Sequence, residues 1–67
     1  MKTEEQIIDE VYENKVYGIC NVLFDALISK ENDEQAEEAE ARFNRGLKIV
    51  QAVRDRAKAL LKEELEK

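Results

Sequence analysis

The stretch Ser29-Lys30-Glu31-Asn32-Asp33 decides the fold of this 67-residue chain, because it is the one clear interruption of helical sequence. Turn-forming residues cluster here and the regular spacing of apolar residues stops. The chain has no proline and only two glycines, so the sequence marks no second break. We therefore expect one all-α domain, an antiparallel hairpin with a first helix over about 3–29, a turn over about 30–32 and a second helix over about 33–65.

The first helix has a start signal and an apolar face. Thr3 and Gln6 have the spacing of a capping box, in which each side chain binds a free backbone N–H of the other residue. The apolar face follows at steps of three and four residues. It consists of Ile8, Tyr12, Val16, Ile19, Leu23 and Ala26. After Val16 apolar residues spread around the helix, with Cys20, Phe24, Leu27 and Ile28 on a second flank and Val22 on a third.

The second helix begins at Asn32 or Asp33, since both residue types are good N-caps. Asn32 and Gln35 again have capping-box spacing. A heptad pattern then predicts the contact line with the first helix. The line runs through Ala36, Ala39, Phe43, Gly46, Val50, Val53, Ala57 and Leu60, with Leu47 and Leu61 beside it. Gly18 and Gly46 either allow close packing of backbones or occupy tolerant positions, and the sequence leaves both readings open.

The apolar surface exceeds what two helices can cover, which predicts self-association. Large exposed apolar patches usually mark an interface, and two identical hairpins packed as a four-helix bundle would bury them. We therefore expect a homodimer. The predicted core and dimer-interface residues are Val16, Ile19, Cys20, Leu23, Phe24, Leu27, Ile28, Phe43, Leu47, Val50, Val53 and Leu60. Cys20, among apolar neighbours, is expected to be an inert core thiol.

The net charge of −5 conceals an uneven distribution. Residues 1–41 carry 3 basic and 12 acidic groups, whereas residues 42–67 carry 8 basic and 4 acidic groups. On one flank of the second helix Arg42, Arg45, Ile49 and Arg56 lie at helical spacing. This arginine stripe either grips phosphate or carboxylate groups of a partner or pairs with Asp9, Glu10 and Glu13 of the same or a partner chain. We prefer the second interpretation.

The composition excludes most catalytic chemistry. The chain has no histidine and one cysteine, so a histidine-based triad, a histidine metal site and a disulfide scaffold are all absent. The carboxylate pairs Glu10 with Glu13, Glu34 with Glu37 and Glu37 with Glu40 have magnesium-ligand spacing. They lie outside the apolar face, however, and we expect them to be solvated. The sequence predicts no cofactor, no metal and no enzymatic activity.

The run Asp33-Glu34-Gln35-Ala36-Glu37 after the turn, together with the chain length, resembles Rop, a small plasmid protein family. The resemblance implies a dimer of helical hairpins that binds paired RNA loops. Rop's RNA-binding face is basic and on its first helix, whereas the first helix here is acidic between Thr3 and Glu13. We therefore use the resemblance for architecture and not for function.

The leading hypothesis is a small, non-enzymatic interaction or regulatory protein of the kind that phages, plasmids and bacterial operons encode. It would act as a homodimer that binds another protein. The alternative is a Rop-like RNA or DNA adaptor that uses the arginine stripe, and a metal-dependent hydrolase is least favoured. The most apolar run, residues 16–28, is too short for a membrane span, and a single cysteine fits a reducing compartment, so we expect a cytoplasmic protein.

Overall fold

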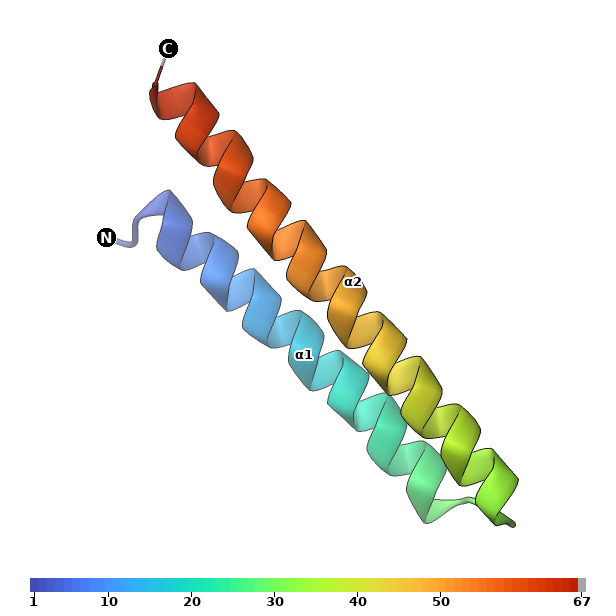
Figure 1. Cartoon of the computed structure of the whole chain (residues 1–67). Coiled ribbons are helices and arrows are strands. Elements are labelled where there is room, and N and C mark those ends of the chain that lie inside the picture. Colours follow the sequence, from blue (N-terminus) through green and yellow to red (C-terminus); the bar gives the residue numbers. More distant parts are fainter. Residues whose placement is uncertain (67) are drawn as a thin grey trace.

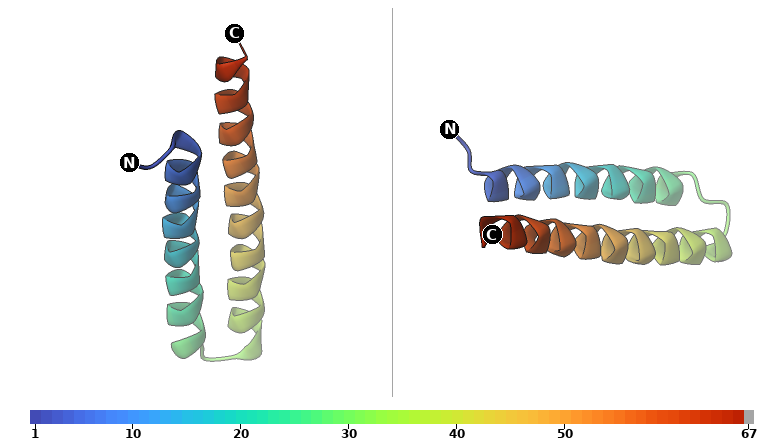
Figure 2. Two further views of the ribbon diagram at one scale, coloured as in Figure 1. Left: turned by 90° about the vertical axis from the view of Figure 1, so that its left-hand side faces the viewer. Right: turned by 90° about the horizontal axis from the view of Figure 1, so that it is seen from above.

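The computed structural model describes residues 1–66, and in them the chain forms two helices and no strand. Helix α1 covers Glu4–Ile28 and helix α2 covers Asp33–Leu65. The helices run antiparallel and side by side, with both termini at the end opposite the turn (Figures 1 and 2). The all-α class and the two helices are therefore confirmed, with boundaries within about one residue of the predicted ones.

The N-terminus of α1 has the predicted capping box. The Gln6 backbone N–H donates to Thr3 Oγ1 at 3.1 Å, and the Thr3 backbone N–H donates to Gln6 Oε1 at 2.9 Å. Both are donors that a helix start leaves without an intrahelical partner. Glu4 and Glu5 lie in the same first turn, where the helix dipole favours negative charge. Local sequence is therefore enough to fix where α1 begins.

The start of α2 differs from the prediction in one bond. Asn32 Oδ1 accepts from the Gln35 backbone N–H at 2.9 Å, as expected of an N-cap. Gln35 Oε1, however, accepts from the backbone N–H of Glu31 at 2.7 Å rather than from that of Asn32. The Gln35 side chain therefore ties the turn itself to the first turn of α2, which holds the connection between the helices in place.

The hairpin is a single layer of two helices with little buried interior. The Cα atoms extend over 54 × 22 × 6 Å. Ala39 is the one described residue that is classed as buried, at 8% exposure. The predicted contact face of α1 is confirmed, since Ile8, Tyr12, Val16, Ile19, Leu23 and Ala26 are all half-buried. A layer this thin leaves the two broad faces of the hairpin open to solvent.

The predicted contact line of α2 is correct in its first part and wrong in its second. Phe43, Gly46 and Val50 are half-buried, but Val53 and Leu60 are 61% and 49% exposed. Arg54 and Leu61 are half-buried in their place. A straight α-helix drifts by about 20° per heptad from a 3.5-residue repeat. After two heptads the larger heptad residues Val53 and Leu60 have turned away from α1 and the next residue along the chain faces it, while Ala57 of the predicted line is half-buried as expected.

Within the described residues, neither helix is both long and apolar enough to cross a membrane.

Candidate functional site

Exposed aliphatic side chains from both helices gather on one broad face of the hairpin. Helical spacing of 3.6 residues per turn puts them on the same side of their helices, and their exposed fractions lie between 47% and 64%. We call this surface the grooved face. Its aliphatic residues are Ile7, Val11 and Val22 of α1 and Ile49, Val53 and Leu60 of α2.

Two shallow grooves run between the helices on this face. The turn-end groove has a volume of about 170 Å³ and is lined by Ile19, Val22, Leu23, Ala26, Ala39, Arg42, Phe43 and Gly46. The open-end groove has a volume of about 390 Å³ and is lined by Ile7, Ile8, Val11, Tyr12, Lys15, Ile49, Val50, Val53, Arg54 and Ala57. Most of these side chains are apolar, so both grooves suit the side chains of another helix better than a charged small molecule.

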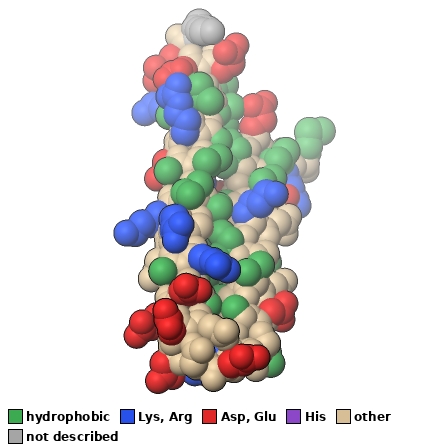
Figure 3. Space-filling view, turned by 90° about the vertical axis from the view of Figure 1, so that its right-hand side faces the viewer, with side chains coloured by type: hydrophobic (Ala, Val, Ile, Leu, Met, Phe, Trp, Pro, Cys, Tyr) green, Lys and Arg blue, Asp and Glu red, His purple; other side chains and the backbone are tan. Residues whose placement is uncertain are grey.

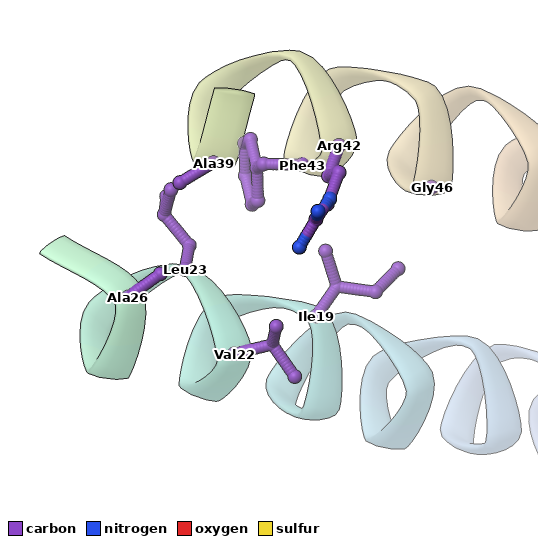
Figure 4. Close-up of a pocket in the computed structure, with 8 residues that line it drawn as sticks. All are labelled: Ile19, Val22, Leu23, Ala26, Ala39, Arg42, Phe43 and Gly46. Atoms are coloured by element: carbon purple, nitrogen blue, oxygen red, sulfur yellow. The ribbon is translucent and has the colours of Figure 1, made fainter. Parts of the chain in front are cut away.

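The charge around the grooved face is not uniform. Figure 3 shows a band of hydrophobic side chains along the junction of the helices, with lysine and arginine beside its middle part. Aspartate and glutamate gather toward both ends of the hairpin in the same view. Figure 4 shows that the Arg42 guanidinium extends over the turn-end groove toward Val22 and Ile19. The face is therefore apolar along its centre and charged along its edges, which is the usual anatomy of a protein interface.

A cation–π contact forms one wall of the open-end groove. The Arg54 guanidinium carbon lies 4.5 Å from the centre of the Tyr12 ring. Arg54 Nε also donates to Asp55 Oδ1 at 3.0 Å. This hydrogen bond is the main cause that raises the pKa of Arg54 above its ordinary value. Sequence reasoning missed Arg54, although its position four residues after Val50 puts it on the side of α2 that faces α1.

The structure separates the arginine stripe from the acidic residues of α1. Arg42 and Arg45 are exposed and make no ion pair in the part of the chain that the structure describes, while Arg56 Nη1 lies 3.6 Å from Glu63 Oε1. Asp9 instead pairs with Lys58, with 2.7 Å between Lys58 Nζ and Asp9 Oδ1, and Glu10 pairs with Lys2. Within the described residues the stripe forms no ion pair with Asp9, Glu10 or Glu13 of the same chain. Pairing with a partner chain stays a prediction.

The predicted interface residues fall on two different sides of the hairpin. Val16, Ile19, Leu23, Phe43, Leu47 and Val50 are half-buried between or beside the helices, as are Cys20 and Leu27. Phe24 and Ile28 are 64% and 81% exposed, and neither lines a groove. Phe24 follows Val22 by two residues and so lies about 200° from it around α1. Phe24, Ile28 and the 62% exposed Tyr17 thus form a separate outer stripe of α1. Their place in a dimer stays a prediction.

Both glycines have room for a side chain. A Cβ atom on Gly46 would lie 3.6 Å from Ile19 Cδ1, which is ordinary van der Waals contact. A Cβ atom on Gly18 would have nothing within 4 Å. Close approach of the two helices is therefore not what requires glycine at either position.

Acidic side chains do not converge into a metal site. Among residues 1–66, no group of three or more His, Cys, Asp or Glu side chains is placed to hold a metal ion. The carboxylate pairs of the sequence lie on exposed positions of both helices.

Comparison with known proteins finds no match: no family model, no curated protein and no solved structure is similar to this chain.

Proposed function

We propose that this protein is a non-enzymatic interaction protein, in which two copies pack through their grooved faces into a four-helix bundle that then binds another protein. The observation that carries the proposal is the alignment of six exposed aliphatic side chains and two apolar grooves on one face. Helices of a stable domain bury their apolar stripes against a second layer. A second copy of the hairpin supplies that layer.

The size of the grooved face suits an interface between two proteins. From the Cα extents of 54 by 22 Å, its footprint is on the order of 1,000 Å², which exceeds the ~800 Å² that each partner contributes to a standard interface. Among residues 1–66 of a single hairpin, only Ala39 is buried. A chain of this length has a small core and marginal stability, and oligomerisation is a common remedy.

We propose a second copy as the occupant because the face carries both projecting side chains and hollows. Val22, Val53 and Leu60 stand out from their helices, while the two grooves are hollows of side-chain size. Insertion of side chains from one helix layer into the hollows of the other is how helices of bundles pack. Two-fold symmetry covers the grooved face of each copy with that of the other. Closed two-fold dimers are also the commonest oligomers.

The outer stripe of α1 remains for another protein in such a bundle. Tyr17, Phe24 and Ile28 lie on the side of α1 away from the grooved face, so self-association leaves them exposed. Aromatic residues in this setting favour protein contacts. Glu10 and Glu13 lie on the same side of the helix one to five turns earlier, which favours a partner with basic groups beside its apolar surface.

A first experiment measures the molecular mass by light scattering over a concentration series. We expect about twice the chain mass of 7.8 kDa at micromolar concentration. A mass of one chain throughout the series refutes the bundle.

A second experiment tests the binding of another protein to the outer stripe. It compares the proteins that the wild-type protein and the Phe24→Asp variant capture from the source cell. Loss of a captured protein with Phe24→Asp, while the mass and helicity stay unchanged, supports the outer stripe.

One observation favours the alternative function, an RNA or DNA adaptor. Arg42 and Arg45 have no ion pair in the described part of the chain, so their charge is free for phosphate groups. Affinity for a hairpin RNA would then fall steeply with salt and with Arg45→Ala. Absence of binding at 50 mM salt removes this alternative.

A further inference from the structure

The outer side of α1 changes from acidic to apolar along its length, and this order describes the protein that would bind there. We propose that the partner is an amphipathic helix of about 20 residues, basic in one half and apolar in the other, which lies along the outer side of α1. This inference rests on the part of the proposed function that assigns the outer stripe to another protein.

The side chains on this side of α1 recur at alternating steps of three and four residues. This is the spacing of a coiled-coil contact line, and it runs through Glu10, Glu13, Tyr17, Cys20, Phe24 and Leu27. Cys20 and Leu27 are half-buried at the edge of the line, and its other members are exposed. Another helix repeats its side chains in the same way, so it can pack along the whole line. An extended strand has a period of two and matches the line at few positions.

The first half of the line is acidic and has little basic charge near it. Residues 3–29 hold one basic residue, Lys15, which lines the open-end groove about 160° around α1 from Tyr17. Glu13 makes no ion pair among the described residues. Glu10 pairs with Lys2, but the two side chains are 47% and 59% exposed, and such a pair is weak. The two carboxylates therefore attract a basic partner and repel phosphate groups.

The order of charge along the line disfavours a second copy as this partner. Parallel α1 helices that share the whole line place Glu10 and Glu13 of both copies together, so like charges repel. Antiparallel helices that share the whole line place the same glutamates against Phe24 and Leu27, which buries carboxylates without a partner. A helix with lysine or arginine opposite the glutamates and apolar residues opposite Phe24 avoids both costs.

The length of the line sets the length of the partner helix. Glu10 and Ile28 are 18 residues apart, which is five turns and about 27 Å. A helix of about 20 residues covers that distance. Its basic groups lie about 16–21 Å from the residue that meets Phe24, because Glu13 and Glu10 precede Phe24 by 11 and 14 residues.

Two synthetic peptides test this inference. Both are 20-residue amphipathic helices with leucine on the contact line of one half, and the contact line of the other half carries lysine in one peptide and glutamate in the other. Binding to the full chain is measured by fluorescence anisotropy at 50 mM salt. We expect the lysine peptide to bind at least 10-fold more tightly than the glutamate peptide, and Phe24→Ala to weaken its binding about 10-fold.

Charge reversal on α1 gives the sharper result. Glu10→Lys/Glu13→Lys should reverse the preference, so that the glutamate peptide binds more tightly. The matched control is Glu37→Lys/Glu38→Lys, which makes the same charge change at exposed positions of α2 and should keep the preference for lysine. Circular dichroism checks that each variant keeps its helices.

Four results overturn the inference. They are equal binding of the two peptides, a preference that Glu10→Lys/Glu13→Lys leaves in place, a reversal by the control variant, and binding that Val22→Ala/Val53→Ala removes while Phe24→Ala does not. Light scattering separates this inference from the bundle of the proposed function. A single-chain mass with the lysine preference intact refutes the bundle alone, whereas a dimer that Phe24→Ala dissociates puts a second copy on the outer stripe and refutes the basic partner.

Discussion

The variant Val22→Ala/Val53→Ala is the sharpest test of the grooved face. The two valines come from different helices and are 64% and 61% exposed in the single hairpin. Alanine is the best helix former, so the substitutions do not weaken either helix. The expected result is a protein that keeps its helices and loses most of its tendency to dimerise.

The magnitude follows from the area that a second copy would cover. Full burial of a valine contributes about 1.5–3 kcal/mol, so covering about three-fifths of it contributes about 1 kcal/mol per side chain. A dimer contains four such side chains, which gives about 4 kcal/mol in total. The dissociation constant should therefore rise about 1,000-fold.

Sedimentation equilibrium measures this change, with far-ultraviolet circular dichroism as the check on helicity. The matched control is Tyr17→Ala/Phe24→Ala, which removes two larger side chains that are 62% and 64% exposed on the outer stripe of α1. If the grooved face forms the interface, the control dimerises like the wild type. If the interface instead includes Phe24, as the sequence predicts, the control weakens the dimer.

Two results would refute the reasoning. One is a dissociation constant of the valine variant within about 3-fold of the wild type. The other is a control variant that dimerises less well than the valine variant, because the outer stripe would then be the surface that two copies share.

Three further outcomes follow from local contacts. Thr3→Ala should lower the stability by about 1 kcal/mol, because Thr3 caps α1, and a melting temperature within 1 °C of the wild type would contradict this. A double-mutant cycle on Lys58 and Asp9 should give a coupling of about 0.2–1 kcal/mol that fades in 1 M salt; a coupling that salt leaves unchanged argues against an ion pair. In the single hairpin Gly46→Ala should raise the stability by about 0.5–1 kcal/mol, since its Cβ meets Ile19 at ordinary contact distance, and a loss in thermal unfolding at concentrations where the protein is monomeric would contradict this.

Local signals in the sequence predict the helices well. The N-caps at Thr3 and Asn32 and the turn between them depend on bonds between residues at most four positions apart. Such bonds form wherever the sequence places the right side chains, whatever the rest of the chain does. The residue line of α1 that faces α2 is equally predictable, because one helix period sets it.

The contact line of α2 and the grooved face could not be predicted in the same way. A heptad pattern assigns Val53 and Leu60 to the contact with α1, while the structure puts Arg54 there, stacked on Tyr12. The spacing of Ile7 and Val11 does suggest a second apolar line on α1. Sequence alone, however, does not tell which line faces the other helix and which remains exposed.

The sequence by itself determines that this chain makes two capped helices joined by a short turn, because side chains near each break satisfy the free backbone groups of the helix ends. It also determines that the hairpin carries more apolar surface than it can bury. The tertiary structure decides which apolar residues stay exposed. The angle at which α2 turns against α1 leaves Val22 and Val53 on one open face and Phe24 on the other side of α1, and it leaves Arg42 and Arg45 without a carboxylate of the described chain. These choices depend on how two helices rotate against each other, a property of the pair that neither helix encodes alone.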